Sequence, residues 1–249
     1  MRSGHAVATV SPVIAAGVGL RRGPCWVLRS ASFRLEQPGA GGAVLGIVAD
    51  GQAAAPALID LLAGRTAPGY GVLRVLGHDL TTVAGRRAAR GRIGIAIRGG
   101  RPLPGVRVRG LVERSARTAC GPDEDRRLLV AAILDRLALA PWAEVPIRSA
   151  PELVARRARI AAAAVRQPEL LLMDGLLDDL SCPDLAGLIE TMRDLERDTA
   201  LIVTGGDRDA ITQACPEMLV LAGGVLIGNR PPTLPPAMQC PQRQPAYCD

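Results

Sequence analysis

Residues 46–64 read GIVADGQAAAPALIDLLAG, and this stretch carries the strongest indication of how the chain folds. Its first residues belong to a short apolar run, 44–48, which is typical of a buried strand. Small residues follow, and apolar side chains then recur at helical spacing from Leu58 to Leu62. The stretch therefore predicts a strand, a loop of small residues and a helix, in that order.

The same alternation of strand and helix continues along the rest of the chain. Further strands are predicted at 71–76, 93–97, 170–173 and 200–204, and helices at 108–139 in at least two segments, 152–166, 183–197 and 208–214. Residues 218–221 and 225–227 predict a closing hairpin, because two glycines join them. Strands that alternate with helices favour a parallel sheet with helices on both faces.

The composition limits the classes of protein to which the chain can belong. A chain of 249 residues suits one large domain, or one domain with an inserted subdomain. The net charge is +6, but only 2% of the residues are aromatic, which argues against a surface that stacks on nucleic acid. All 30 cationic side chains are arginines, so chemistry that depends on a lysine ammonium is excluded. Six widely spaced cysteines and two histidines argue against a zinc site.

The two ends of the chain differ from its middle. The apolar patch at residues 6–18 is interrupted by serine, proline and glycine, and it is too short to span a bilayer. We therefore expect membrane contact only through a partner. Beyond residue 230 the composition shifts to proline, glutamine and alanine, which predicts a loosely held tail over 231–249.

Three phrases of the chain, at consistent separations, resemble the ATP-binding cassette (ABC) transporter ATPases over roughly residues 17–230. The phrase 46–64 resembles the family's strand, phosphate loop and first helix; 71–80 resembles its next strand and turn; and 167–174 resembles its Walker B strand. The resemblance implies an α/β, P-loop NTPase-like nucleotide-binding domain over 1–230. It implies a mostly parallel sheet core, N-terminal antiparallel strands and a helical subdomain inserted at about 99–154.

The segment that matches the phosphate loop lacks the groups that hold phosphate. Such a loop works because glycines let backbone N–H groups approach the phosphates, a lysine neutralises their charge, and a hydroxyl helps to hold magnesium. By the resemblance, the nucleotide-binding positions here are Ala49, Asp50, Gly51, Gln52, Ala53, Ala54, Ala55, Pro56 and Ala57. Ala55 stands at the lysine position, Pro56 and Ala57 stand at the hydroxyl positions, and Asp50 adds negative charge. We expect the turn to survive without its anion site.

The positions that would carry out hydrolysis are also changed. Asp174 matches the carboxylate that meets magnesium in the family, and the alternative is a strand-end carboxylate that caps the next turn. Gly175 stands at the position of the glutamate base, and Gly206 stands at that of the switch histidine. Arg98 takes the place of the family's glutamine, where it would form a metal-free anion site or, as the favoured alternative, a solvated side chain.

Two further positions depart from the family pattern. The signature loop, which caps the partner's nucleotide in the family, corresponds to Ala150, Pro151, Glu152, Leu153 and Val154. The alternative is that Pro151 and Glu152 begin a helix. Arg22 falls about where an aromatic side chain would stack on adenine.

Taken together, these residues predict a degenerate ATP-binding cassette subunit of an ABC-type membrane transporter. It would be a structural or regulatory half, cytoplasmic and peripheral at the inner face of the cell membrane. Its partners would be a permease subunit and a second nucleotide-binding domain, in a homodimer or a heterodimer, with no nucleic acid. ATP and Mg²⁺ are implied by the resemblance alone and would bind weakly or not at all, so ATPase activity would be small or absent.

The arginines around residues 98–109 form the expected docking surface for the permease. They are Arg98, Arg101, Arg107 and Arg109, which would suit an acidic partner loop or lipid headgroups, and the alternative is a solvated face. Two other functions remain open at this stage. One is a weak ATPase that uses Asp174 and substitute arginine cations, and the other is a soluble scaffold with no transporter.

Overall fold

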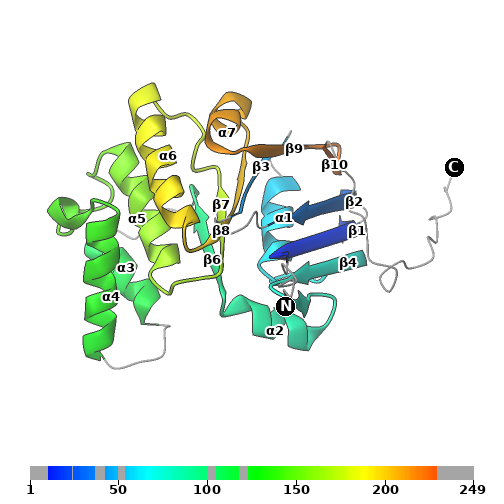
Figure 1. Ribbon diagram of the computed structural model, residues 1–249, viewed down its shortest axis with the longest axis horizontal. Helices are drawn as coiled ribbons and strands as arrows, with labels where there is room; N and C mark the ends of the chain where they lie inside the picture. The colour runs from blue at the N-terminus through cyan, green and yellow to red at the C-terminus, as the bar shows by residue number, and fades with distance from the viewer. Residues whose placement is uncertain are drawn as a thin grey trace, which may run out of the picture.

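The computed structural model describes residues 11–23, 25–36, 43–49, 54–99, 105–117 and 123–228. Within these ranges, ten strands form one mixed sheet in the order β5-β4-β1-β2-β10-β9-β3-β8-β7-β6. Figure 1 shows the antiparallel strands at one end of the molecule and most of the helices at the other. The predicted tail at 231–249 lies outside the described residues.

The N-terminal part of the sheet is antiparallel. Its strands are β1 (Val13–Arg22), β2 (Cys25–Leu35), β4 (Tyr70–Val75) and β5 (His78–Asp79). β1 pairs with both β2 and β4. In the second half of β2, Ala31, Phe33 and Leu35 are buried on one face, as the period-two geometry of a half-buried strand requires.

The central part of the sheet is parallel, as predicted. Its strands are β3 (Val44–Ala49), β6 (Ile93–Ile97), β7 (Leu170–Asp174), β8 (Ala200–Gly205) and β9 (Glu217–Ala222). β3 lies between β9 and β8, and β7 lies between β8 and β6. β10 (Val225–Ile227) pairs antiparallel with β9, which is the predicted hairpin.

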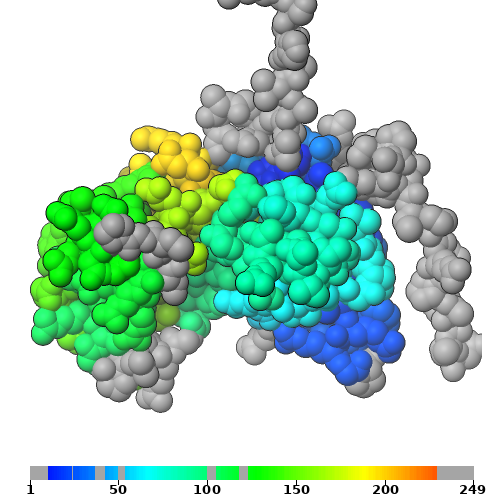
Figure 2. Space-filling model, turned by 90° about the horizontal axis from the view of Figure 1, so that it is seen from below, coloured from blue at the N-terminus to red at the C-terminus, as the bar shows by residue number. Residues whose placement is uncertain are grey.

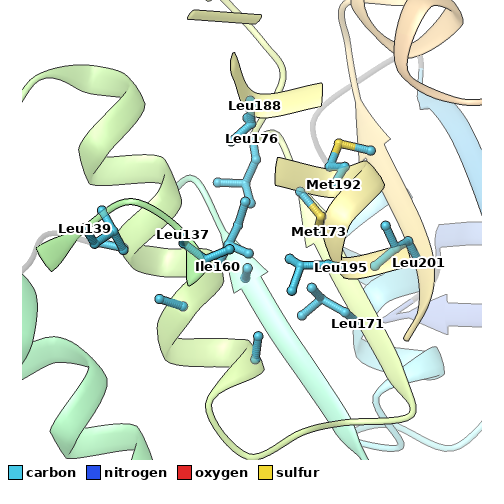
Figure 3. Close-up of a cluster of buried hydrophobic side chains, with 14 of the residues drawn as sticks. Leu137, Leu139, Ile160, Leu171, Met173, Leu176, Leu188, Met192, Leu195 and Leu201 are labelled. Carbon is cyan, nitrogen blue, oxygen red and sulfur yellow. The ribbon is translucent and has the colours of Figure 1, made fainter. Parts of the chain in front are cut away.

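Alternate side chains of the parallel strands enter two hydrophobic clusters, one on each face of the sheet. Leu170 and Leu172 of β7 pack in the cluster that holds α1 (Ala54–Leu62), whereas Leu171 and Met173 pack in the other. Figure 3 shows Leu171 and Met173 beside Met192 and other side chains of α6 (Cys182–Glu196). This arrangement explains why these strands read as continuous apolar runs.

The remaining helices complete the second face of the sheet and extend beyond it. α5 (Glu152–Ala164), α6 and α7 (Arg208–Ala214) pack against the cluster around Met173. α3 (Val108–Ala116), α4 (Asp123–Arg136) and the short 3₁₀ helix at Ala140–Trp142 lie in the chain between β6 and β7, within the region predicted as a helical insertion. Among the described residues, no helix combines the length and apolar character needed to cross a bilayer.

One helix, α2 (Val83–Arg90), was not predicted from the sequence. Ala89 is its one buried residue, so it carries no apolar stripe. The Thr82 hydroxyl accepts the N–H of Gly85 and caps its start. Arg90 donates to the carbonyl of Gly64 at 2.9 and 2.6 Å, so polar contacts hold this helix against the end of α1.

Candidate functional site

The residues that the sequence singled out gather where the parallel strands end. In the sheet register Ile97 lies beside Asp174, and Asp174 lies beside Thr204. Val48, one residue before the end of β3, lies beside Gly205. In sheets of this kind, ligands bind at the carboxyl edge of the strands. The structure therefore brings Ala49, Arg98, Asp174, Gly175 and Gly206 to one edge, which we call the carboxyl edge.

The first turn of α1 offers no charged group or hydroxyl to this edge. α1 begins at Ala54, and Ala55 and Ala57 are buried, with 7% and 0% of their surface exposed. Pro56 is exposed and has no N–H to donate, although proline fits the first turn of a helix sterically. Residues 50–53 of the predicted loop lie outside the described residues.

Asp174 is the last residue of β7 and is partly buried. The Thr204 hydroxyl donates to its Oδ1 at 2.6 Å. Burial raises the pKa of Asp174 above the ordinary value for an aspartate, and the nearby carboxylates of Asp178 and Asp60 raise it further, against the effect of the Thr204 hydrogen bond. Within the described part of the chain, no group of three or more acidic, histidine or cysteine side chains could hold a metal ion. The side-chain partner that the structure shows for Asp174 is the Thr204 hydroxyl on the neighbouring strand.

Gly175, at the position of the glutamate base, has a backbone conformation that favours glycine. Its φ is +66°, in the left-handed region, and its N–H donates to the Thr204 carbonyl at 2.8 Å. After this turn the chain sends Leu176 and Leu177 into the core, where they are 0% and 1% exposed. Leu176 is seen in the cluster in Figure 3. Any residue other than glycine at position 175 would have to hold its backbone in a conformation that L-residues rarely populate.

The loop after β7 also holds the loop after β8 through Asp178. Its Oδ1 accepts the backbone N–H groups of Gly206 and Asp207, each at 3.0 Å. A Cβ atom on Gly205 would lie 2.6 Å from the same oxygen, so the approach depends on that glycine. The position of the switch histidine is thus part of a loop that an internal carboxylate holds. The sequence analysis missed this contact, and the acidic pair at 178–179 between two strand ends is the signal that could have found it.

A buried arginine also holds the loop after β7. Arg156 of α5 is 1% exposed, and its Nη1 donates to the carbonyls of Leu176 at 2.6 Å and Asp178 at 2.7 Å. Its Nε donates to Glu152 Oε1 at 2.7 Å. A buried guanidinium is tolerated only when it is hydrogen-bonded in this way. Arg156 therefore links the start of α5 to residues 176–178, a role that the sequence analysis did not find.

Arg98, at the glutamine position, is engaged in an ion pair. Its Nη1 lies 2.6 Å from Asp179 Oδ2, and its backbone N–H donates to the Asp174 carbonyl at 2.8 Å. The two side chains are 39% and 78% exposed, so this pair is at the surface, where ion pairs contribute little to stability. Arg98 thus contacts the loop after β7 and faces solvent in part.

The signature position forms the start of a helix. Pro151 is the N-cap residue of α5, and Glu152 is its first residue. Leu153 and Val154 continue the helix, and Val154 is buried. This is the alternative that the sequence analysis gave for these residues, with the Glu152 carboxylate near the positive end of the helix dipole.

An aromatic residue, Trp26, lies opposite Arg21 in the pairing of β1 with β2, one position from Arg22. Arg22 itself pairs with Asp60 of α1 at 3.2 Å. Trp26 is 36% exposed; the Arg21 guanidinium lies 4.8 Å from its ring centroid, and Tyr70 meets it edge to face at 5.2 Å. The sequence analysis did not single out Trp26, although it lies four residues after Arg22.

The arginines predicted as a docking surface are partly neutralised. Arg107 and Arg109 both donate to the Glu144 carboxylate, at 2.7 and 3.0 Å. Hydrogen bonds from these two arginines, Arg107 first, lower the pKa of Glu144. Arg101 lies outside the described residues. This patch therefore presents two guanidinium groups around one carboxylate.

The fold is that of an ABC-type nucleotide-binding domain. The structure superposes on cbiO1 from Clostridium perfringens, a part of the ABC transporter complex cbiONQ, with a TM-score of 0.76 and 18% sequence identity over 88% of each chain. It also superposes on an ATP-binding cassette of an ABC transporter in its ADP conformation, with a TM-score of 0.74 and 14% identity over 88% of this chain and 90% of that one. These comparisons confirm the predicted fold.

In sequence, the chain is similar to ATP-binding proteins of methionine importers. It is 27% identical to the methionine import ATP-binding protein MetN 2 of Burkholderia mallei over 215 residues, which cover 84% of this chain and 53% of the relative. It is 27% identical to MetN of Xanthomonas euvesicatoria pv. vesicatoria over 196 residues, covering 77% and 58%. The chain thus spans about half the length of these curated relatives. No protein-family model matches it. The resemblance to ABC transporter ATP-binding proteins is confirmed.

Proposed function

We propose that the chain is an ATP-binding cassette subunit of an ABC-type membrane transporter that acts as a structural or regulatory half and hydrolyses little or no ATP itself. It would pair with a competent ATPase domain or lie beneath a permease. The similarity to ATP-binding proteins of transporters supports the class. The observation that carries the loss of hydrolysis is Gly175, which stands in a left-handed turn where a general base would be needed.

The residues at the carboxyl edge do not fit ATP and Mg²⁺. A triphosphate that leaves water needs cations and hydrogen-bond donors in exchange. The chain contains no lysine, and the described residues of the first turn of α1 are alanine and proline. Asp174 is desolvated and lies near other carboxylates, which opposes its ionisation without a cation. We therefore derive no hydrolytic step for this chain.

The contacts at the carboxyl edge support a structural role. Asp178 accepts the N–H groups of the loop after β8, Arg156 donates to the carbonyls of the loop after β7, and Arg98 pairs with Asp179. These donors and acceptors therefore find their hydrogen-bond and ion-pair partners within the chain itself. An edge of this kind holds its shape without a nucleotide, which is what a non-hydrolysing half requires.

The partner is proposed to be a permease, contacted through the surface of residues 98–109 and the neighbouring helices. Arg107 and Arg109 share Glu144, so the patch keeps an excess of one positive charge and would favour an acidic segment of the partner. A second nucleotide-binding domain would complete the assembly, with the chain held at the inner face of the membrane through the permease.

A weak ATP-binding subunit is the second candidate, and a specific observation favours it. The relatives at 27% identity are named ATP-binding proteins, and this chain keeps Asp174 at the end of β7. In that case the purified chain would hydrolyse ATP at a measurable rate, and the Asp174→Asn substitution would lower that rate. In our proposal turnover stays at the background rate in both proteins.

Two measurements on the full chain test the proposal. The first is ATP turnover with Mg²⁺, with a hydrolysing ABC domain as positive control; activity well above background that Asp174→Asn abolishes would establish the second candidate. The second is affinity capture from detergent-solubilised membranes of the source cell with the tagged chain. Recovery of a permease supports the proposal, whereas recovery of soluble proteins alone would establish a scaffold with no transporter.

A further inference from the structure

A cavity of about 430 Å³ lies away from the carboxyl edge, near the amino ends of β6 and β7. Its walls come from the turn after α1, the end of α2, α3 and the last turn of α5, and they include Ile93 and Pro168 at the strand starts. Figure 2, which views the molecule from below, shows a hollow between the part that carries α3 to α5 and the part that carries α1 and α2. The cavity is therefore separate from the predicted nucleotide positions.

Among the described residues, the charged side chains that line this cavity are arginines. They are Arg65, Arg90, Arg114 and Arg166, and no aspartate or glutamate of the described ranges lines the cavity. Arg65 pairs with Asp60 at 3.4 Å. Arg90 donates to the carbonyl of Gly64, and within the described residues neither Arg114 nor Arg166 pairs with a carboxylate. The acid next to Pro168, Glu169, is already held by Arg92. Four like charges thus surround one concave surface.

The remaining lining gives the cavity a small and partly apolar floor. Ile93, Ile95 and Ala163 contribute apolar surface, and the glycines at 91 and 94 add no side chain. The volume falls within the range of about 300–1,000 Å³ that is usual for small-molecule sites. Guanidinium groups match the planar geometry of carboxylates and phosphates and remain charged at any pH in the normal range.

We propose that this cavity binds a small anion that carries two or more phosphate or carboxylate charges. The anion would compensate the four guanidinium groups, which have one carboxylate, Asp60, among their described partners. An acidic protein segment is the competing occupant, but a cavity of this volume holds only about one turn of a helix, so a small ligand makes fuller use of the arginines. The cavity lies apart from the carboxyl edge, so anion binding there does not depend on whether the carboxyl edge hydrolyses ATP.

Calorimetry on the full chain with inorganic pyrophosphate and with citrate, without Mg²⁺, tests the proposal. We expect one-to-one binding of at least one of them, weaker at high salt. Arg114→Gln and Arg166→Gln should each weaken binding about tenfold, the effect of losing one charged hydrogen bond of ordinary strength. Both side chains are exposed, so neither change should disturb folding. Arg208→Gln, at the start of α7 by the carboxyl edge, is the control and should leave binding unchanged.

Three results would overturn the inference. The first is no binding of either anion at millimolar concentration. The second is binding that Arg114→Gln and Arg166→Gln leave unchanged, or that Arg208→Gln weakens equally, because the anion would then bind elsewhere or by overall charge alone. The third is binding of an oligoglutamate peptide at this site while both small anions fail, which would assign the cavity to a protein partner.

Discussion

Arg156→Met removes the buried guanidinium that holds residues 176–178 and is predicted to destabilise the protein strongly. Methionine has a similar length, so it fills much of the same volume and leaves little cavity. It donates no hydrogen bond, so the carbonyls of Leu176 and Asp178 lose a donor at 2.6 and 2.7 Å. Each buried carbonyl left without a partner costs about 1–3 kcal/mol, so we expect a loss of about 3 kcal/mol.

The Glu152 carboxylate adds little to this cost. It is 56% exposed and returns to water when Arg156 is removed. Glu152→Gln is therefore the matched control, because it weakens the ion pair and keeps both carbonyl hydrogen bonds. Glutamine keeps an oxygen that can accept the hydrogen bond from Arg156 Nε, so we expect this change to cost up to about 1 kcal/mol.

Thermal and denaturant unfolding of the two variants, measured side by side, check this reasoning. For a chain of this size 1 kcal/mol shifts Tm by about 2–4 °C, so Arg156→Met should lower Tm by about 6–12 °C. Glu152→Gln should lower it by at most about 4 °C. The reasoning is refuted if Arg156→Met stays within about 1 kcal/mol of the parent, or if both variants lose the same stability.

Three further predictions concern the carboxyl edge and the cysteines. Gly175→Glu restores the carboxylate of a general base, but it should lower the free energy of unfolding by about 1–2 kcal/mol, because the backbone at this position is left-handed, and it should leave ATP turnover at background. Gly175→Ala should show a similar loss of stability. A Gly175→Glu protein that is stabilised or that hydrolyses ATP would contradict this. Because burial raises the pKa of Asp174, ionisation of its carboxyl group destabilises the folded protein as pH rises through the folded-state pKa. Asp174→Asn should therefore raise Tm at pH 7, and this gain in Tm should vanish as pH falls below the ordinary aspartate pKa of 3.8. A gain in Tm that persists at low pH would argue against this explanation. Burial raises the pKa of Cys215 to about 12, so mass spectrometry after iodoacetamide treatment of the native protein should find Cys25 and Cys182 alkylated and Cys215 intact; early labelling of Cys215 would contradict its burial.

The parallel strands and most helices could be predicted because their apolar patterns match their burial. The runs at 170–173 and 200–204 are buried on both faces, and that burial is what a continuous apolar run indicates. The helix α2 carries no such pattern, because it is held by the Thr82 cap and by hydrogen bonds from Arg86 and Arg90. Composition cannot distinguish these arginines from solvated ones.

At the candidate site, the positions could be predicted but the contacts could not. The ends of parallel strands meet at one edge, so the neighbourhood of Asp174 and Arg98 follows from topology. The bonds from Arg156 and Asp178 join residues 20 to 29 positions apart, and they depend on the turn at Gly175. A single sequence does not specify the backbone angle of that turn, so it can mark the acidic pair at 178–179 as a candidate but not the N–H groups that Asp178 binds.

ATP titrated into the full chain by calorimetry, with and without Mg²⁺, tests the central claim most directly. A carboxyl edge without a phosphate-binding cation should give flat titrations up to millimolar ATP under both conditions. One-to-one binding with a micromolar dissociation constant, equivalent to about −8 kcal/mol, would contradict the account.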